Sequence, residues 1–193
     1  MKKMRIMSAV LLALSMSFVL TGCGSKNNES KIWMMGMESR ADTIREECKT
    51  AISFETIDLD GNPVSSETLF AQNKVTMINI WATTCGPCIN ELPELEEMNK
   101  EFRQKGGAIV GLLDDVWVSN MKYLDEAKEI VEDTGVTFTN LCAWDGYDTV
   151  LSAVGTPTTY FVDSQGRIIG EPILGANPAK YREKMEEYLA QAK

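Results

Sequence analysis

Cys85 and Cys88 enclose a Gly-Pro pair in the sequence Cys-Gly-Pro-Cys. Thiols at this spacing can exchange with a disulfide on another molecule and then close a disulfide with each other. The surrounding pattern places Cys85 at the start of a helix, where unpaired backbone N–H groups and the helix dipole stabilise a thiolate. Cysteines in that position have pKa values of roughly 3.5 to 7.5 instead of about 8.5. We therefore expect Cys85 to be the nucleophile and Cys88, one turn later, the resolving thiol.

The segments on either side of the pair predict a strand followed by a helix. Residues 75–81 form a nearly continuous apolar run, typical of a strand buried on both faces of a sheet. After Pro87, apolar residues recur at three- and four-residue steps, and Gly106-Gly107 is expected to end the helix. The recurring residues are Leu92, Leu95, Met98 and Phe102.

Glu91 lies three residues after Cys88 and therefore on the same face of the predicted helix. A carboxylate in that position can take or give the proton that Cys88 exchanges. We assign this role to Glu91 as a hypothesis.

A Cys-x-x-Cys pair also occurs as half of a zinc site or as a structural disulfide. A zinc site needs four ligands, and this chain has no histidine and only Cys48 and Cys142 as scattered partners. A structural disulfide across so short a loop removes little chain entropy. The redox interpretation is favoured, and we expect no metal and no cofactor.

The segment Trp81–Pro93 resembles thioredoxin-like proteins, and within them the extracytoplasmic TlpA/ResA branch of thiol:disulfide oxidoreductases. The resemblance covers roughly residue 54 to the C-terminus. It depends on an aromatic residue four before the first cysteine, the Gly-Pro pair, the glutamate and a helix-kinking proline, which are here Trp81, Gly86, Pro87, Glu91 and Pro93. It implies that Trp81, Gly86 and Pro87 contribute to substrate binding.

The chain departs from the better-known cytosolic members at two positions. Asn79 stands near the place of a buried Asp, and Thr84 replaces the Trp before the first cysteine. Proton transfer through Asn79 is therefore not expected, which leaves Glu91 as the better candidate.

Residues 155–163 carry the second family signature, with Pro157 opening a strand. The resemblance implies a cis bond before Pro157, a loop lying against the cysteine pair, and Thr156 offering backbone hydrogen bonds to an extended partner segment. The alternative is an ordinary turn proline, because cis bonds are uncommon.

The resemblance implies an α/β, thioredoxin-like fold with a central mixed sheet flanked by helices, an N-terminal β-hairpin extension and an insertion after the second core strand. The expected elements are a hairpin over 54–64, strands at 108–113 and 136–141, helices at 119–131 and 145–154, and a final helix from Asn177-Pro178. In that last helix Tyr181, Met185 and Tyr188 share one face.

The first residues read as a targeting segment: Lys2, Lys3 and Arg5 precede an apolar stretch that ends in Leu20-Thr21-Gly22-Cys23. This ending resembles the bacterial lipobox, in which cleavage before the cysteine accompanies diacylglycerol attachment. We expect residues 1–22 to be a lipoprotein signal peptide, 23–50 the lipid anchor at Cys23, a tether and a short helix, and 51–193 the thioredoxin-like domain. An ordinary cleaved signal with an incidental cysteine is the alternative.

The net charge of the 193-residue chain is −9, and removal of residues 1–22, with three bases and no acids, lowers it to −12. This charge argues against nucleic acid and against electrostatic lipid binding, so membrane attachment must come from the lipid. Cys48 and Cys142 can pair in an oxidising compartment or remain buried thiols.

These features predict a monomeric, extracytoplasmic enzyme, anchored to the cell membrane as a lipoprotein, that reduces protein disulfides through the Cys85–Cys88 dithiol. The resemblance implies clients such as apocytochrome c and a membrane thiol electron donor. The alternatives are an electron donor to a methionine sulfoxide reductase or peroxidase, a disulfide-forming oxidant, and a non-catalytic lipoprotein binding module.

Overall fold

A computed structural model describes residues 51–192 of the chain. Its central feature is a five-stranded sheet with the strand order β5-β4-β3-β6-β7, accompanied by a separate two-stranded hairpin, β1-β2. The elements are β1 (Glu55–Ile57), β2 (Pro63–Ser65), α2 (Ser66–Ala71), β3 (Val75–Trp81), α3 (Gly86–Arg103), β4 (Gly107–Trp117), α4 (Leu124–Thr134), β5 (Asn140–Ala143), α5 (Tyr147–Val150), β6 (Thr158–Asp163), β7 (Ile173–Leu174) and α6 (Pro178–Gln191).

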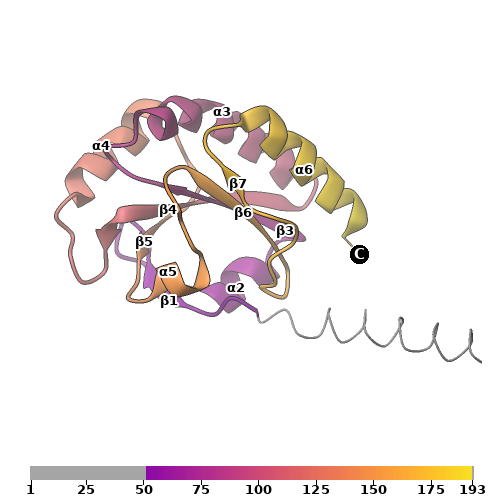
Figure 1. Cartoon of the computed structure of the whole chain (residues 1–193), viewed down its shortest axis with the longest axis horizontal. Helices are drawn as coiled ribbons and strands as arrows, with labels where there is room; N and C mark the ends of the chain where they lie inside the picture. Colours follow the sequence, from indigo (N-terminus) through magenta and orange to yellow (C-terminus); the bar gives the residue numbers. More distant parts are fainter. Residues whose placement is uncertain (1–50, 193) are drawn as a thin grey trace, which may run out of the picture. The chain divides into compact units, whose positions relative to one another are not determined.

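The sheet is mixed, as the sequence predicts. β3 pairs in parallel with β4, and β4 in parallel with β5, whereas β6 runs antiparallel to β3 and β7 antiparallel to β6. Figure 1 shows α3, α4 and α6 on one side of the sheet and α2 and α5 on the other. The insertion after β4 therefore supplies a helix of one layer, α4, and an edge strand, β5.

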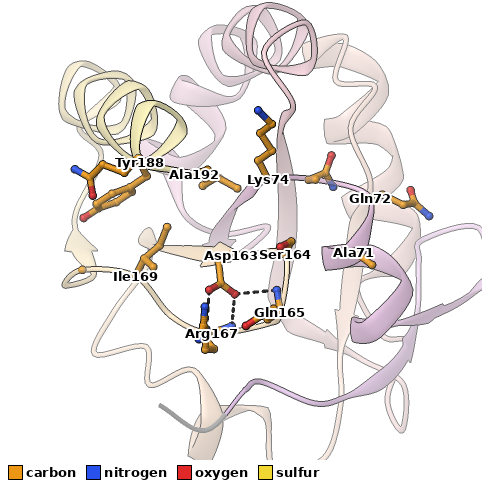
Figure 2. A pocket seen from close by; sticks show the side chains of 14 residues that line it. Ala71, Gln72, Lys74, Asp163, Ser164, Gln165, Arg167, Ile169, Tyr188 and Ala192 are labelled. Atoms are coloured by element: carbon orange, nitrogen blue, oxygen red, sulfur yellow. Dashed lines mark hydrogen bonds and ion pairs between the residues drawn. The ribbon is translucent and has the colours of Figure 1, made fainter. Parts of the chain in front are cut away.

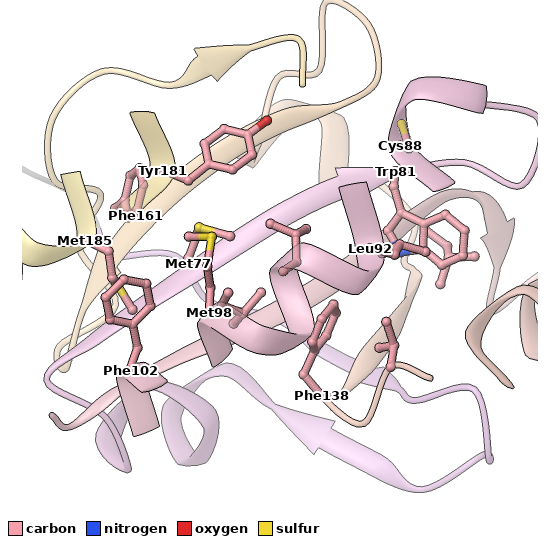
Figure 3. Packing of buried hydrophobic residues seen from close by; sticks show 14 of the residues in the cluster. Met77, Trp81, Cys88, Leu92, Met98, Phe102, Phe138, Phe161, Tyr181 and Met185 are labelled. Carbon is pink, nitrogen blue, oxygen red and sulfur yellow. The ribbon is translucent and has the colours of Figure 1, made fainter. Parts of the chain in front are cut away.

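Two apolar clusters cover the two faces of the sheet, because successive side chains of a strand point to opposite sides. From β3, Met77 and Trp81 enter the cluster under α3 and α6, and Ile78 and Ile80 enter the cluster beneath α2 and α5. Figure 3 shows the first cluster, where side chains of α3 such as Leu92 meet those of β3, β6 and α6. Each fully buried Leu, Met or Phe contributes about 1.5–3 kcal/mol, so this layer holds α3 firmly on the sheet.

Several predicted boundaries are confirmed. Residues 75–81 form β3, buried along its whole length, and α3 begins at Gly86 and ends at Arg103, just before Gly106-Gly107. The hairpin turns at 58–62, and Asn177 caps α6 by accepting a hydrogen bond from the Lys180 N–H.

Other boundaries are wrong. The helix expected over 119–131 begins only at Leu124, because Trp117 and Asn120 form a tight turn by exchanging two backbone hydrogen bonds, and it ends at Thr134, where Gly135 has φ +69°. The strand expected at 136–141 is the four-residue strand β5, which begins only at Asn140. It begins late because the Thr137 N–H and hydroxyl donate hydrogen bonds to the Glu96 carboxylate of α3.

The helix expected over 145–154 is the single turn α5, with Gly146 and not Asp145 at its N-cap. β4 extends four residues beyond the predicted Leu113. The short helix α2 was not predicted, although Ser65 marks its start by accepting a hydrogen bond from the Thr68 N–H.

We predict that Gly111→Ala destabilises the domain by about 1–3 kcal/mol, the usual range for overpacking a core. A Cβ at Gly111 would lie 1.9 Å from Asn140 Oδ1 and 2.9 Å from Trp81 Nε1, in the place of the hydrogen bond between these two side chains. Denaturant unfolding checks this, with Gly155→Ala as the control because a Cβ there meets nothing within 4 Å. Equal unfolding free energies for the two variants would contradict the prediction.

Candidate active site

Cys85 and Cys88 lie where β3 gives way to α3, and they form a disulfide with an S–S length of 2.01 Å and a Cα–Cα distance of 5.3 Å. Cys85 is the N-cap residue of α3, and its sulfur accepts a hydrogen bond of 3.3 Å from the Cys88 N–H. Cys85 is partly exposed, whereas Cys88 is completely buried. A partner can therefore reach the sulfur of Cys85 but not that of Cys88, which matches the predicted division between nucleophile and resolving thiol.

The loop before β6 lies against this disulfide. The Thr156–Pro157 peptide bond is cis, as the resemblance implies, and the Thr156 carbonyl oxygen lies 3.5 Å from Cys85 Sγ. In the reduced protein a Cys85 thiol at this place can donate a hydrogen bond to that oxygen. The Gly175 N–H, directly after β7, donates to the Pro157 carbonyl oxygen and thereby supports the loop.

Glu91 is buried beneath the cysteines, with 4% of its surface exposed. Its Oε1 accepts a hydrogen bond of 2.9 Å from Asn79 Nδ2, which also donates to Thr159 Oγ1 at 3.1 Å. The pKa of the Glu91 carboxyl is raised to about 7, chiefly by burial and also by the charge of Glu94, while the hydrogen bond from Asn79 opposes the shift. A group with this pKa exchanges protons readily at neutral pH.

Asn79 therefore has a place in the site that the sequence did not reveal. It does not titrate, in keeping with the expectation that no proton passes through it, but its amide group orients the Glu91 carboxyl. Thr159 and Tyr181 were also missed as site residues. The sequence had placed Thr159 only within the second family signature and Tyr181 only on one face of the last helix.

Other predicted site residues are placed as follows. Gly86 and Pro87 are exposed beside Cys85, where a client can contact them. Trp81 has no exposed surface, and its indole N–H donates to Asn140 Oδ1, so its burial argues against the expected client-binding role. Trp81 instead packs in the apolar cluster that also contains Cys88.

Cys142 is buried in β5, with its sulfur 3.8 Å from the Asp58 carbonyl oxygen. Burial raises the pKa of this thiol. Cys48 and Cys23 lie outside the described residues, as do the signal segment and the tether, so the Cys48–Cys142 pairing and the lipid attachment stay predictions.

A cavity of about 810 Å³ lies elsewhere, at the other end of β3 (Figure 2). Lys74, at the start of β3, and Tyr188 of α6 line it, together with Asp163 and Arg167, which form an ion pair of 2.8 Å. No cysteine lines this cavity, so it is separate from the disulfide. None of the helices described within residues 51–192 is long and apolar enough to cross a membrane.

Several known proteins are similar to this chain, and their names fit the chemistry of this site. Thiol-disulfide oxidoreductase ResA of Bacillus anthracis is 28% identical over 145 residues, covering 73% of this chain and 75% of the relative. Thioredoxin-like protein YneN of Bacillus subtilis is 29% identical over 123 residues, 64% of this chain and 69% of that one. A crystal structure of a thioredoxin-family thiol:disulfide interchange protein from Chlorobium tepidum superimposes with a TM-score of 0.61 at 25% identity, covering 72% of this chain and 94% of the other.

The fold and the Cys85–Cys88 site thus define a thioredoxin-fold thiol:disulfide oxidoreductase of the ResA-like type, which confirms the resemblance seen in the sequence. The model of the AhpC/TSA family matches residues 48–170, well over half of the chain. The protein belongs to the AhpC/TSA family.

We predict that Glu91 makes stability fall as the pH rises from about 4.5 to about 7. Its pKa is about 7 in the folded protein against an ordinary value of 4.5, so the folded state binds the proton more tightly and loses that advantage as the pH rises through this window. The pKa shift of Glu91 contributes about 3 kcal/mol to the unfolding free energy at low pH, at 1.36 kcal/mol per pKa unit.

Denaturant unfolding of the oxidised protein across this pH range, compared with Glu91→Gln, measures the effect. Glutamine at position 91 does not titrate, so the unfolding free energy of the variant is expected to lack this decrease. The difference between the variant and the wild type should therefore shift in favour of the variant between pH 4.5 and pH 7. Parallel pH profiles would show that Glu91 is not the group responsible.

Proposed function

We propose that this protein is a membrane-tethered reductase of extracytoplasmic protein disulfides. The observation that carries the proposal is the pairing of an accessible Cys85 sulfur at the α3 N-terminus with a buried Cys88 and a buried carboxyl, Glu91. The name of the ResA relatives, thiol-disulfide oxidoreductase, supports the chemistry.

The reaction follows from the order of exposure. The Cys85 thiolate attacks one sulfur of a client disulfide, forming a mixed disulfide and releasing the other client sulfur as a thiolate. Cys88 then attacks Cys85 Sγ, which closes the Cys85–Cys88 disulfide and releases the second client sulfur. Two electrons pass from the dithiol to the client, and the two client thiolates take up protons.

Glu91 serves the second step. Cys88 is buried and must lose its proton before it can attack, and the carboxylate of Glu91, one helical turn away, accepts it. The folded-state pKa of about 7 leaves part of the Glu91 population ionised, and therefore able to act as a base, at neutral pH. Asn79 holds the acceptor oxygen in place through its 2.9 Å hydrogen bond.

The client binds along the surface formed by Gly86, Pro87 and the Thr156–Pro157 loop. The exposed Gly86 and Pro87 at the start of α3 and the Thr156–Pro157 loop flank Cys85, which allows an extended segment to lie across the sulfur and to pair with the Thr156 backbone. Diacylglycerol on Cys23, a second membrane thiol protein as electron donor, and clients such as apocytochrome c complete the proposal. These features rest on the sequence resemblance.

Replacement of the cysteines tests the mechanism. Cys85→Ser is expected to lower insulin-disulfide reduction to the uncatalysed rate, because the nucleophile is lost. Cys88→Ser is expected to accumulate a mixed disulfide with the client, because the second attack cannot occur; mass spectrometry under non-reducing conditions detects it. Cys142→Ala is the control and is expected to retain activity. Activity in Cys85→Ser would exclude the proposed function.

The direction of electron flow is tested by the reduction potential of the Cys85–Cys88 couple against glutathione buffers. We expect a value below about −220 mV, on the side of the thioredoxin type near −270 mV. A value above about −150 mV would identify a disulfide-forming oxidant instead.

A further inference from the structure

β4 continues past the end of its partner strand at the redox site. The last paired residues of β3 and β4 are Trp81 and Leu113, yet β4 runs on to Trp117. Because parallel strands advance together, Asp115, two residues after Leu113, lies alongside Thr83, two residues after Trp81. This places an acidic side chain against the short loop that leads into Cys85.

The Asp115 carboxylate holds this loop through two hydrogen bonds. Its Oδ2 accepts from the Thr83 N–H at 2.8 Å and from the Thr83 hydroxyl at 2.6 Å. Thr83 is 3% exposed, and the Cys85 N–H closes the same turn by donating to the Ala82 carbonyl oxygen at 3.0 Å. Asp115 thus orients the peptide segment that sets the position of the Cys85 sulfur.

The negative charge of Asp115 is not neutralised by a cation among residues 51–192, since none of the ion pairs described there includes it. Its second oxygen, Oδ1, is buried and has no hydrogen-bond partner. Two further carboxylates are close to this end of the sheet: the pKa of Asp114 is raised by burial, and also by the charges of Asp115 and Asp148.

The charge of Asp115 opposes the effect of the α3 N-terminus on the Cys85 thiolate. The α3 N-terminus stabilises a thiolate on Cys85, whereas the Asp115 carboxylate, which is hydrogen-bonded to Thr83 two residues before Cys85, repels it. A less stable thiolate means a less stable reduced protein. The equilibrium then moves toward the disulfide, and the couple becomes a stronger reductant, the reverse of the strongly oxidising type, whose reduced form is stabilised.

We propose that Asp115 is a positioning residue that clamps the Ala82–Cys85 turn and, through its uncompensated charge, disfavours the Cys85 thiolate and makes the dithiol more reducing. The inference rests on the proposed function, because it concerns the strength of that reductant. It assigns to a residue of the neighbouring strand a role that the Cys-Gly-Pro-Cys motif does not contain.

The test compares Asp115→Asn with Asp114→Asn in the full-length chain in detergent. Asparagine at 115 keeps an acceptor for the two Thr83 hydrogen bonds but removes the charge. Asparagine at 114 removes a neighbouring charge that has no hydrogen bond to the loop, and thus serves as the matched control. In a Cys88→Ser background, the pH dependence of iodoacetamide alkylation, read by mass spectrometry on the Cys85 peptide, gives the titration of Cys85 alone.

For Asp115→Asn we expect the midpoint of alkylation to fall by about half a pH unit, roughly a threefold gain in thiolate below the midpoint. With Cys88 intact, the exchange constant with glutathione should shift up to about threefold toward the reduced protein, equivalent to about 14 mV. Asp114→Asn should change the alkylation midpoint and the exchange constant by less than half as much as Asp115→Asn does.

Two outcomes overturn the proposal. An unchanged midpoint in Asp115→Asn, even with a lower melting temperature, would leave Asp115 a purely structural residue. An equal shift in Asp114→Asn would assign the effect to the general field of the acidic cluster. Failure of the proposed function is recognised separately, because the wild type would then not reduce insulin, whereas the titration of Cys85 can still be measured.

Discussion

The parallel pairing of β3 with β4 is the constraint on which the site depends. Two adjacent parallel strands cannot be joined by a tight turn, so the chain must leave the carboxyl end of β3, cross one face of the sheet and return to the start of β4. The helix α3 makes this crossing, and its N-terminus therefore lies directly after β3. Cys85 occupies that junction, where helix polarity acts on its sulfur.

The same packing explains why Cys85 is partly exposed and Cys88 is buried, although they are only three residues apart. α3 is held on the sheet by an apolar stripe that includes Leu92 and Leu95, and Cys88 lies on this inward face, whereas Cys85 lies at the helix end beside solvent. Burial of that face also encloses Glu91. A carboxylate is costly to bury with a single hydrogen-bonding partner, so the proton is held up to neutral pH, as the proposed role of Glu91 requires.

Two segments beside the carboxyl end of β3 complete the arrangement. The Thr156–Pro157 loop approaches Cys85 from β6, and Asp115 approaches from β4, so the sulfur lies between contributions from both neighbours of β3. Ligand sites of α/β sheets commonly occupy this edge, because the loops there converge while the strands beneath them stay rigid. The cavity of Figure 2, at the opposite end of β3, has no such group of reactive side chains.

The sequence by itself determined the redox pair, the strand–helix junction around it and the position of Pro157, because these follow from local spacing and from periodic apolar residues. The mixed sheet followed from the resemblance of these segments to thioredoxin-like proteins. The sequence also placed Glu91 on the face of Cys88. It failed where local signals were weak, as in the segment between Trp117 and Asn140. There a tight turn at 117–120 delays the helix, and a contact between Thr137 and the distant Glu96 shortens the strand. Only the tertiary structure decided that Trp81 hydrogen-bonds Asn140, that Asn79 orients Glu91, and that Asp115 meets Thr83. Strand register and layer packing bring together side chains up to 59 positions apart, which no local pattern encodes.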